Sequence, residues 1–108
     1  MEFKDIAGAD EIAAGEMKAF NIEGRDILLA NYDGEYCAIG NKCSHRGGDL
    51  SKGKLEGSIV TCPRHGSQFN VKTGKCIAGP KIGPLKLSAK DEPVYTVKVE
   101  GGRIQVGL

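Results

Sequence analysis

The sequence predicts an all-β domain of the sandwich or barrel type. Three observations support this prediction. Short runs alternate between apolar and polar residues, as a strand with one buried face requires. Turn residues separate these runs at short and regular spacing. Helical periodicity is weak throughout the 108 residues, and a length of this order corresponds to one ordinary domain with one core.

The clearest strand signals lie in the N-terminal third. Met17–Ile22 and Asp26–Tyr32 flank a turn at Glu23-Gly24-Arg25. Asp33-Gly34 is a strong hairpin dipeptide and leads into Glu35–Ile39. We therefore expect a β-hairpin over residues 26–39.

A second hairpin is expected at the C-terminus. Val94–Glu100 alternates with period two, and Gly101-Gly102 joins it to Arg103–Val106. The one helical candidate is Ala9–Ala14, which Gly15 ends.

The N-terminal segment and the cysteine content bear on the compartment. The first 20 residues lack a basic region followed by an apolar stretch, and no run approaches the roughly 18 apolar residues that span a bilayer. We expect a cytoplasmic protein, without a membrane or nucleic-acid partner and monomeric. In a reducing compartment, the four cysteines indicate metal ligation or simple burial rather than disulfides.

Charge is distributed unevenly along the chain. Residues 1–41 hold nine acids and three bases (−6), residues 42–90 hold ten bases and two acids (+8), and residues 91–108 add −1. The middle segment is also rich in Gly, Pro and Ser, with only short apolar runs such as Ser58–Thr61 and Gln68–Val71. It reads as loops and short strands inserted between two β parts, where functional residues are usually placed.

Both histidines of the chain lie beside a cysteine. The first pair is Cys43-Ser44-His45 and the second is Cys62-Pro63-Arg64-His65. Two cysteines and two histidines can form a structural zinc site. Gly47-Gly48 follows the first pair and Gly66-Ser67 follows the second. Glycine-rich loops readily turn backbone N–H groups toward inorganic sulfide, whereas a single zinc ion with four protein ligands needs fewer such groups.

The two boxes CSHRGGDL and CPRHGSQF, with the following TGK and GPKIGP, closely resemble the Rieske ferredoxin family over about residues 25–108. The resemblance implies the Rieske-type antiparallel sandwich or barrel in one domain, 1–108. Its base would comprise about residues 1–40 and 85–108, and a small inserted cluster-binding subdomain about residues 41–84.

The resemblance also implies the cofactor, one [2Fe–2S] cluster. Cys43 and Cys62 would bind one iron through thiolates, and His45 and His65 would bind the other through neutral imidazoles. Two ferric ions, two sulfides and two thiolates sum to zero charge, whereas four thiolates would give −2. An electron is added more easily to the neutral unit, which raises the reduction potential.

Neighbouring positions are assigned supporting roles by the same resemblance. Ser67 would donate a hydrogen bond to a cluster sulfide, and Pro80–Pro84 would form a stiff loop over the cluster. High-potential members carry a Tyr where this chain has Phe69, so we expect a potential in the lower half of the range of roughly −150 to +300 mV. The inter-loop disulfide of respiratory Rieske proteins would fall at Gly48 and Arg64, and is absent.

Cys37 and Cys76 lie outside the two boxes, and we interpret them as small buried apolar side chains. The expected function is that of a one-electron carrier and not of an enzyme acting alone. It would relay electrons from a flavin-dependent reductase to a terminal oxygenase or similar enzyme, through a positive surface that meets an acidic docking patch. The alternatives are a small Rieske subunit of a nitrite-reductase-like complex and a zinc-stabilised binding module.

Overall fold

The computed structural model describes residues 1–44, 47–64, 66–82, 84–86 and 89–108. Its described elements, in chain order, are β1 (Phe3–Gly8), the 3-10 turn η1 (Ala9–Glu11), β2 (Met17–Ile22), β3 (Arg25–Tyr32), β4 (Glu35–Gly40), the 3-10 turn η2 (Leu50–Lys52), β5 (Lys54–Glu56), β6 (Ile59–Thr61), β7 (Gln68–Asn70), β8 (Cys76–Ala78), β9 (Lys81–Ile82), β10 (Leu85–Lys86), β11 (Val94–Tyr95), β12 (Val97–Glu100) and β13 (Arg103–Gly107). The all-β prediction is therefore confirmed.

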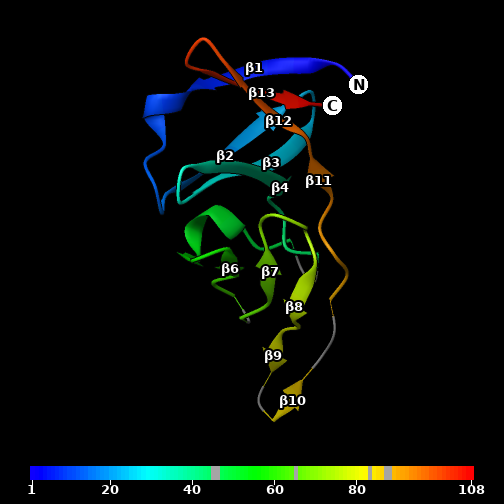
Figure 1. Ribbon diagram of the computed structural model, residues 1–108. Coiled ribbons are helices and arrows are strands. Elements are labelled where there is room, and N and C mark those ends of the chain that lie inside the picture. The colour runs from blue at the N-terminus through cyan, green and yellow to red at the C-terminus, as the bar shows by residue number, and fades with distance from the viewer. Residues whose placement is uncertain (45–46, 65, 83, 87–88) are drawn as a thin grey trace.

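The strands form four antiparallel sheets. Two of them, in the orders β1-β13-β12 and β11-β4-β3-β2, are called the base here, and the first of these carries both chain termini. The inserted sheet, β5-β6-β7-β8, lies on the side of β3 and β4 that is opposite to the β1-β13-β12 sheet (Figure 1). The β9–β10 pair lies at the end of the molecule farthest from the termini, and the longest dimension is 49 Å.

Three tight turns shape the base. Glu23-Gly24, Asp33-Gly34 and Gly101-Gly102 each close a two-residue hairpin, and both residues of each pair have positive φ. This backbone matches the right-handed twist of the flanking strands. The predicted hairpins over 26–39 and at the C-terminus are both present.

The β3–β4 hairpin lies between two cores and is buried on both faces. Successive side chains of a strand point to opposite faces, so Ile27 and Leu29 pack between the two base sheets, whereas Leu28 and Ala30 pack toward the inserted sheet. All four are completely buried. The hairpin thus separates two cores, one between the two base sheets and one beneath the inserted sheet.

Two of the predicted elements take a different form in the structure, and the strand β1 was not predicted. The expected strand over 94–100 is broken at Thr96, because β11 pairs with β4 in one base sheet while β12 pairs with β13 in the other. The helix expected over Ala9–Ala14 is only the single turn η1, since Ile12 already has extended φ and ψ of −128° and 104°.

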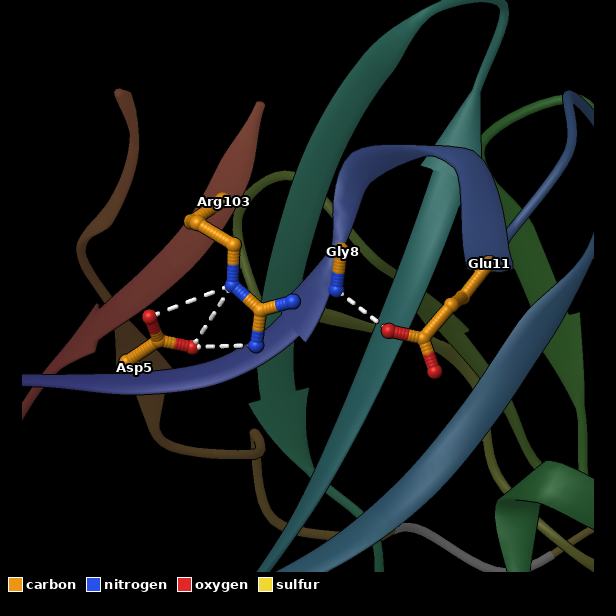
Figure 2. A network of polar contacts seen from close by, with 4 residues as sticks. All are labelled: Asp5, Gly8, Glu11 and Arg103. Atoms are coloured by element: carbon orange, nitrogen blue, oxygen red, sulfur yellow. Dashed lines mark hydrogen bonds and ion pairs between the residues drawn. The ribbon is translucent and has the colours of Figure 1, made fainter. Parts of the chain in front are cut away.

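Polar contacts join the ends of the chain within the base. Figure 2 shows Arg103 of β13 donating to the carboxylate of Asp5 on β1, at 2.7 and 3.2 Å, and the Gly8 amide donating to Glu11. The guanidinium lowers the pKa of Asp5 below its usual value.

No helix long and apolar enough to cross a membrane occurs in the part of the chain that the structure describes.

Candidate metal centre

The first cysteine lies near the start of a narrow loop, the first loop (residues 42–49), of which the structure describes residues 42–44 and 47–49. Lys42 and Asp49 form an isolated antiparallel bridge at its neck. Inside it, the Cys43 amide donates to the Gly48 carbonyl at 2.7 Å, and the Gly47 amide donates back to the Cys43 carbonyl at 2.7 Å. The reversal requires a φ of +69° at Gly47, which glycine adopts without steric cost.

The second loop (residues 61–68) repeats this pattern. Thr61 of β6 pairs with Gln68 of β7 at its neck. The Cys62 amide donates to the Ser67 carbonyl at 2.8 Å, and the Gly66 amide, with φ of +78°, donates to the Cys62 carbonyl at 3.2 Å. The first and second loops therefore have the same construction, and each has one cysteine near its start.

The first and second loops lie against each other. A Cβ atom added to Gly48 of the first loop would lie 2.8 Å from Cys62 Sγ, and 3.3 Å from Cδ of Arg64. Only a residue without a side chain lets the first loop come this close to the second cysteine. The structure thus brings together the two boxes that the sequence separates.

Both cysteines belong to the core beneath the inserted sheet. Cys43 is 4% exposed and Cys62 is 3% exposed. The buried members of this core are Leu28, Ala30, Cys37, Ile39, Cys43, Leu50, Val60, Cys62, Phe69 and Val71. The thiols accordingly face a water-poor environment, which suits a metal group whose charge is neutralised by its own ligands.

Ser67 provides a test of whether an iron–sulfur group fits. Its hydroxyl oxygen is buried and has no hydrogen-bond partner within the described part of the chain. An unsatisfied buried hydroxyl costs about 1–3 kcal/mol, so such groups ordinarily have a partner. A sulfide held between the loops would accept this hydrogen bond, and the residues present therefore fit the group.

A polar network holds the neck of the first loop. Asp49 accepts hydrogen bonds from the Asn41 side chain at 2.8 Å and from the Ser51 amide at 3.0 Å and hydroxyl at 2.5 Å. These bonds, led by that of the Ser51 hydroxyl, lower the pKa of Asp49. The carboxylate also caps the start of η2, so the loop is fixed on the side that faces the base.

The other predicted positions have mixed outcomes. His45 and His65 lie outside the described residues, so their role as ligands stays a prediction. Within the segment Pro80–Pro84, Pro80 is buried and Pro84 is exposed, and β9 and β10 pair across it as a short hairpin. Whether this hairpin covers a cluster also stays a prediction.

The two remaining cysteines lie in or beside the same core. Cys37 is 7% exposed and points into it, which confirms the interpretation as a buried apolar side chain. Cys76 on β8 is only half-buried and packs against its edge. None of the four cysteines of the chain forms a disulfide.

Glu92 is a residue at this site that the sequence analysis missed. It lies 48 positions from Ser44, yet its Oε2 accepts the Ser44 amide at 2.8 Å, and its side chain is buried. Burial raises the pKa of Glu92 to about 7, and hydrogen bonds from Ser44 oppose the shift. An acidic residue next to Pro93 in a polar connector gave no sequence signal for burial.

The two cysteine-bearing loops lie against each other above a buried apolar core and beside the unpartnered Ser67 hydroxyl, an arrangement that fits a metal group held between two loops. Comparison with known proteins identifies the class. Residues 2–102 match the family model described as the Rieske [2Fe-2S] domain. The chain belongs to this family, and its cofactor is one [2Fe–2S] cluster.

Several relatives cover nearly the whole chain. It is 36% identical over 108 residues to the ferredoxin component of biphenyl 2,3-dioxygenase from Rhodococcus jostii, covering 100% of this chain and 94% of that protein. It is 33% identical over 104 residues to the ferredoxin component of the naphthalene 1,2-dioxygenase system from Pseudomonas aeruginosa, covering 96% and 93%. Relatives named as ferredoxin components confirm an electron-transfer protein rather than an enzyme acting alone.

Solved structures agree with this assignment. The ferredoxin of carbazole 1,9a-dioxygenase from Nocardioides aromaticivorans is 28% identical, with a TM-score of 0.81 over 98% of this chain and 97% of that one. A chain in a complex of reduced oxygenase and oxidised ferredoxin of carbazole 1,9a-dioxygenase is 27% identical, with a TM-score of 0.78 over 96% and 91%.

Proposed function

We propose that Cys43, His45, Cys62 and His65 are the four ligands of the cluster and that Ser67 donates a hydrogen bond to one of its sulfides. The observation that carries this proposal is the pair of identical loop closures, each beginning at a cysteine, which lie against each other at Gly48. The histidine follows its cysteine by two positions in the first box and by three in the second.

The protein is a one-electron carrier, and the cluster supplies a site that gains and loses one electron without a bond being broken. The chain's own residues hold the two loops, exclude water from the thiolates and provide the Ser67 hydroxyl. They also keep the backbone of both loops in fixed hydrogen-bonded turns. A rigid and dry surrounding limits the rearrangement that accompanies a change of charge.

We propose that the partners are a flavin-dependent reductase, which gives the electron, and a terminal oxygenase, which takes it. The related chain that accompanies an oxygenase in the carbazole dioxygenase complex supports the second partner. The naming of relatives as ferredoxin components of dioxygenase systems supports the first. Four cysteines without a disulfide support the cytoplasm as the compartment.

We also propose that residues 1–108 form one domain, with the base at about 1–40 and 85–108 and the cluster-binding part at about 41–84. The inserted sheet, whose strands span residues 54–78, supports this division.

Docking would rely on positive charge around the cluster loops. Lys54 pairs with Thr61, directly before Cys62, and is exposed, as are Lys52, Lys75 and Lys90. Lys42 and Lys72 are partly neutralised, because they form ion pairs of 3.2 and 3.3 Å with Asp26 and Glu35 of the base. We propose that the remaining positive surface steers the protein toward an acidic patch on its partners.

The ligand set is tested by iron and sulfide analysis with electron paramagnetic resonance (EPR) of the reduced protein. Two irons and two sulfides per chain, and a spectrum of low average g, are expected. Cys43→Ser and His65→Ala should lose the cluster, while Cys37→Ala should keep it. A colourless protein with one zinc per chain would contradict the proposal.

The docking proposal is tested by electron-transfer rates with a reductase and an oxygenase from a related dioxygenase system. The rate should fall as ionic strength rises, and Lys54→Gln should weaken this dependence. The control is Lys98→Gln, on β12 of the base, which should leave it unchanged. A flat salt profile for the unmodified protein would contradict steering.

A further inference from the structure

The connector before β11 is bonded to several parts of the site at once. We call residues 90–93 the strap. In Figure 1 it follows the grey trace beyond β10 and runs back toward the base. Ser44 Oγ donates to the Lys90 carbonyl at 2.6 Å, the Cys76 amide donates to the Asp91 carboxylate at 2.8 Å, and the Ser44 amide donates to the Glu92 carboxylate at 2.8 Å.

The backbone of the strap is fixed as firmly as its side chains. The Glu92 amide donates to the Gly74 carbonyl at 2.7 Å, in the turn between β7 and β8. The Gly40 amide at the end of β4 donates to the Pro93 carbonyl at 2.9 Å. The strap therefore connects the base, the first loop and the inserted sheet.

Two glycines make room for Glu92. A Cβ atom on Gly40 would lie 2.6 Å from Glu92 Oε1, and one on Gly74 would lie 2.3 Å from the Glu92 carbonyl oxygen. Gly74 also has a φ of +72°. The carboxylate thus lies in a space shaped for it, and its burial carries a desolvation cost that a merely structural connector would avoid with an apolar residue.

The contact of Glu92 is with the loop that carries two predicted ligands. The Ser44 amide belongs to the peptide bond that follows Cys43, and Ser44 directly precedes His45. Fixing this amide fixes the plane of the Cys43–Ser44 peptide, the first of the two peptides between the proposed ligand positions. The Ser44 hydroxyl is held by the same strap, so both the amide and the hydroxyl of Ser44 donate to it.

We propose that Glu92 is a positioning residue for the cluster, which holds the Cys43–Ser44 peptide and through it sets the geometry of the first loop. This proposal rests on the ligand set proposed above. It explains why a carboxyl group is buried beside the first loop. It also assigns a role to the strap, whose sequence lies outside both boxes.

The test compares three variants of the cluster-loaded protein. Glu92→Ala removes the acceptor, and Glu92→Gln retains a side-chain oxygen in nearly the same shape. Asp91→Ala is the matched control, since it removes a carboxylate-to-amide hydrogen bond from the same strap, but to β8 rather than to the first loop. Readouts are the EPR g values of the reduced protein, the rate of cluster loss to a chelator, and hydrogen exchange of a peptide covering residues 41–48.

Glu92→Ala should change the g values, speed cluster loss by about tenfold and speed exchange at Ser44 by a similar factor, as expected for the loss of one buried hydrogen bond. Glu92→Gln should restore the g values. Asp91→Ala should lower the thermal midpoint with unchanged g values. The proposal is overturned if Glu92→Ala keeps the g values and exchange of the unmodified protein. If the unmodified protein lacks the mixed-ligand spectrum, the ligand set has failed instead.

Discussion

Replacement of Gly48 by alanine tests the contact between the two loops. The added Cβ would lie 2.8 Å from Cys62 Sγ and 3.3 and 3.4 Å from Cδ and Cγ of Arg64. The arginine stem is flexible and can move aside. The sulfur cannot, because Cys62 is buried in the core and its amide is bonded to Ser67.

The size of the effect follows from this overlap. Carbon and sulfur atoms that are not bonded to each other normally stay nearly 4 Å apart, so the loops must separate or the thiolate must shift. Overpacking of this kind costs about 1–3 kcal/mol. Because the shift occurs at a proposed cluster ligand, we expect it to appear mainly as weakened cluster binding rather than as loss of the base fold.

The assay is iron content after purification, together with the EPR spectrum and thermal unfolding. Gly48→Ala should lose a substantial share of its iron and alter the spectrum. Gly47→Ala is the matched control, since its φ is +69° but nothing lies within 4 Å of the added Cβ. It should cost on the order of 1 kcal/mol of backbone strain and keep its iron. Wild-type iron content and spectrum in Gly48→Ala would refute the argument.

Three further results are expected. Ser67→Ala should lower the reduction potential by tens of millivolts, on the order of one neutral hydrogen bond, and Phe69→Tyr should raise it; voltammetry that finds neither change would exclude hydrogen bonding as the control. Cys37→Ala and Cys76→Ala should each keep two irons per chain with a modest loss of stability, and iron loss in either would show an incomplete ligand set. Burial raises the pKa of Glu92 in the folded protein from its ordinary value of 4.5 to about 7. Ionisation of Glu92 therefore destabilises the fold as pH rises from 4.5 to about 7, by up to about 3 kcal/mol. The stability gain of Glu92→Gln over wild type in chemical unfolding should therefore grow from pH 5 to 7.5, and a gain independent of pH would contradict the assigned pKa.

Most strands of the base could be predicted from sequence because their turns carry local signals, whereas β1 was missed. Gly24 and Asp33-Gly34 favour two-residue hairpins, and the flanking strands were placed within a residue or two. The break at Thr96 could not be read in the same way. Val94–Glu100 alternates without interruption, and only pairing with strands far away in the sequence moves β11 and β12 into different sheets.

The two cysteine-containing boxes, which the structure brings together, could be located in the sequence because their chemistry is concentrated in a few adjacent residues. The loop closures could not, since the hydrogen bonds at Cys43 and Cys62 depend on φ at Gly47 and Gly66 rather than on residue identity alone. The short strands β5 and β8 were also missed. Three residues are too few for a periodic pattern, and these strands exist by pairing with β6 and β7.

Glu92 shows why a resemblance based on two boxes leaves part of a site unassigned. The boxes contain the proposed ligands of the cluster, and the spacing of these residues is visible in the sequence. The proposed positioning residue Glu92 lies beyond the inserted part, in the strap before β11, and Gly40 and Gly74 leave space beside it. A residue whose role depends on two distant glycines and one amide has no local pattern, so only the folded arrangement assigns it a role.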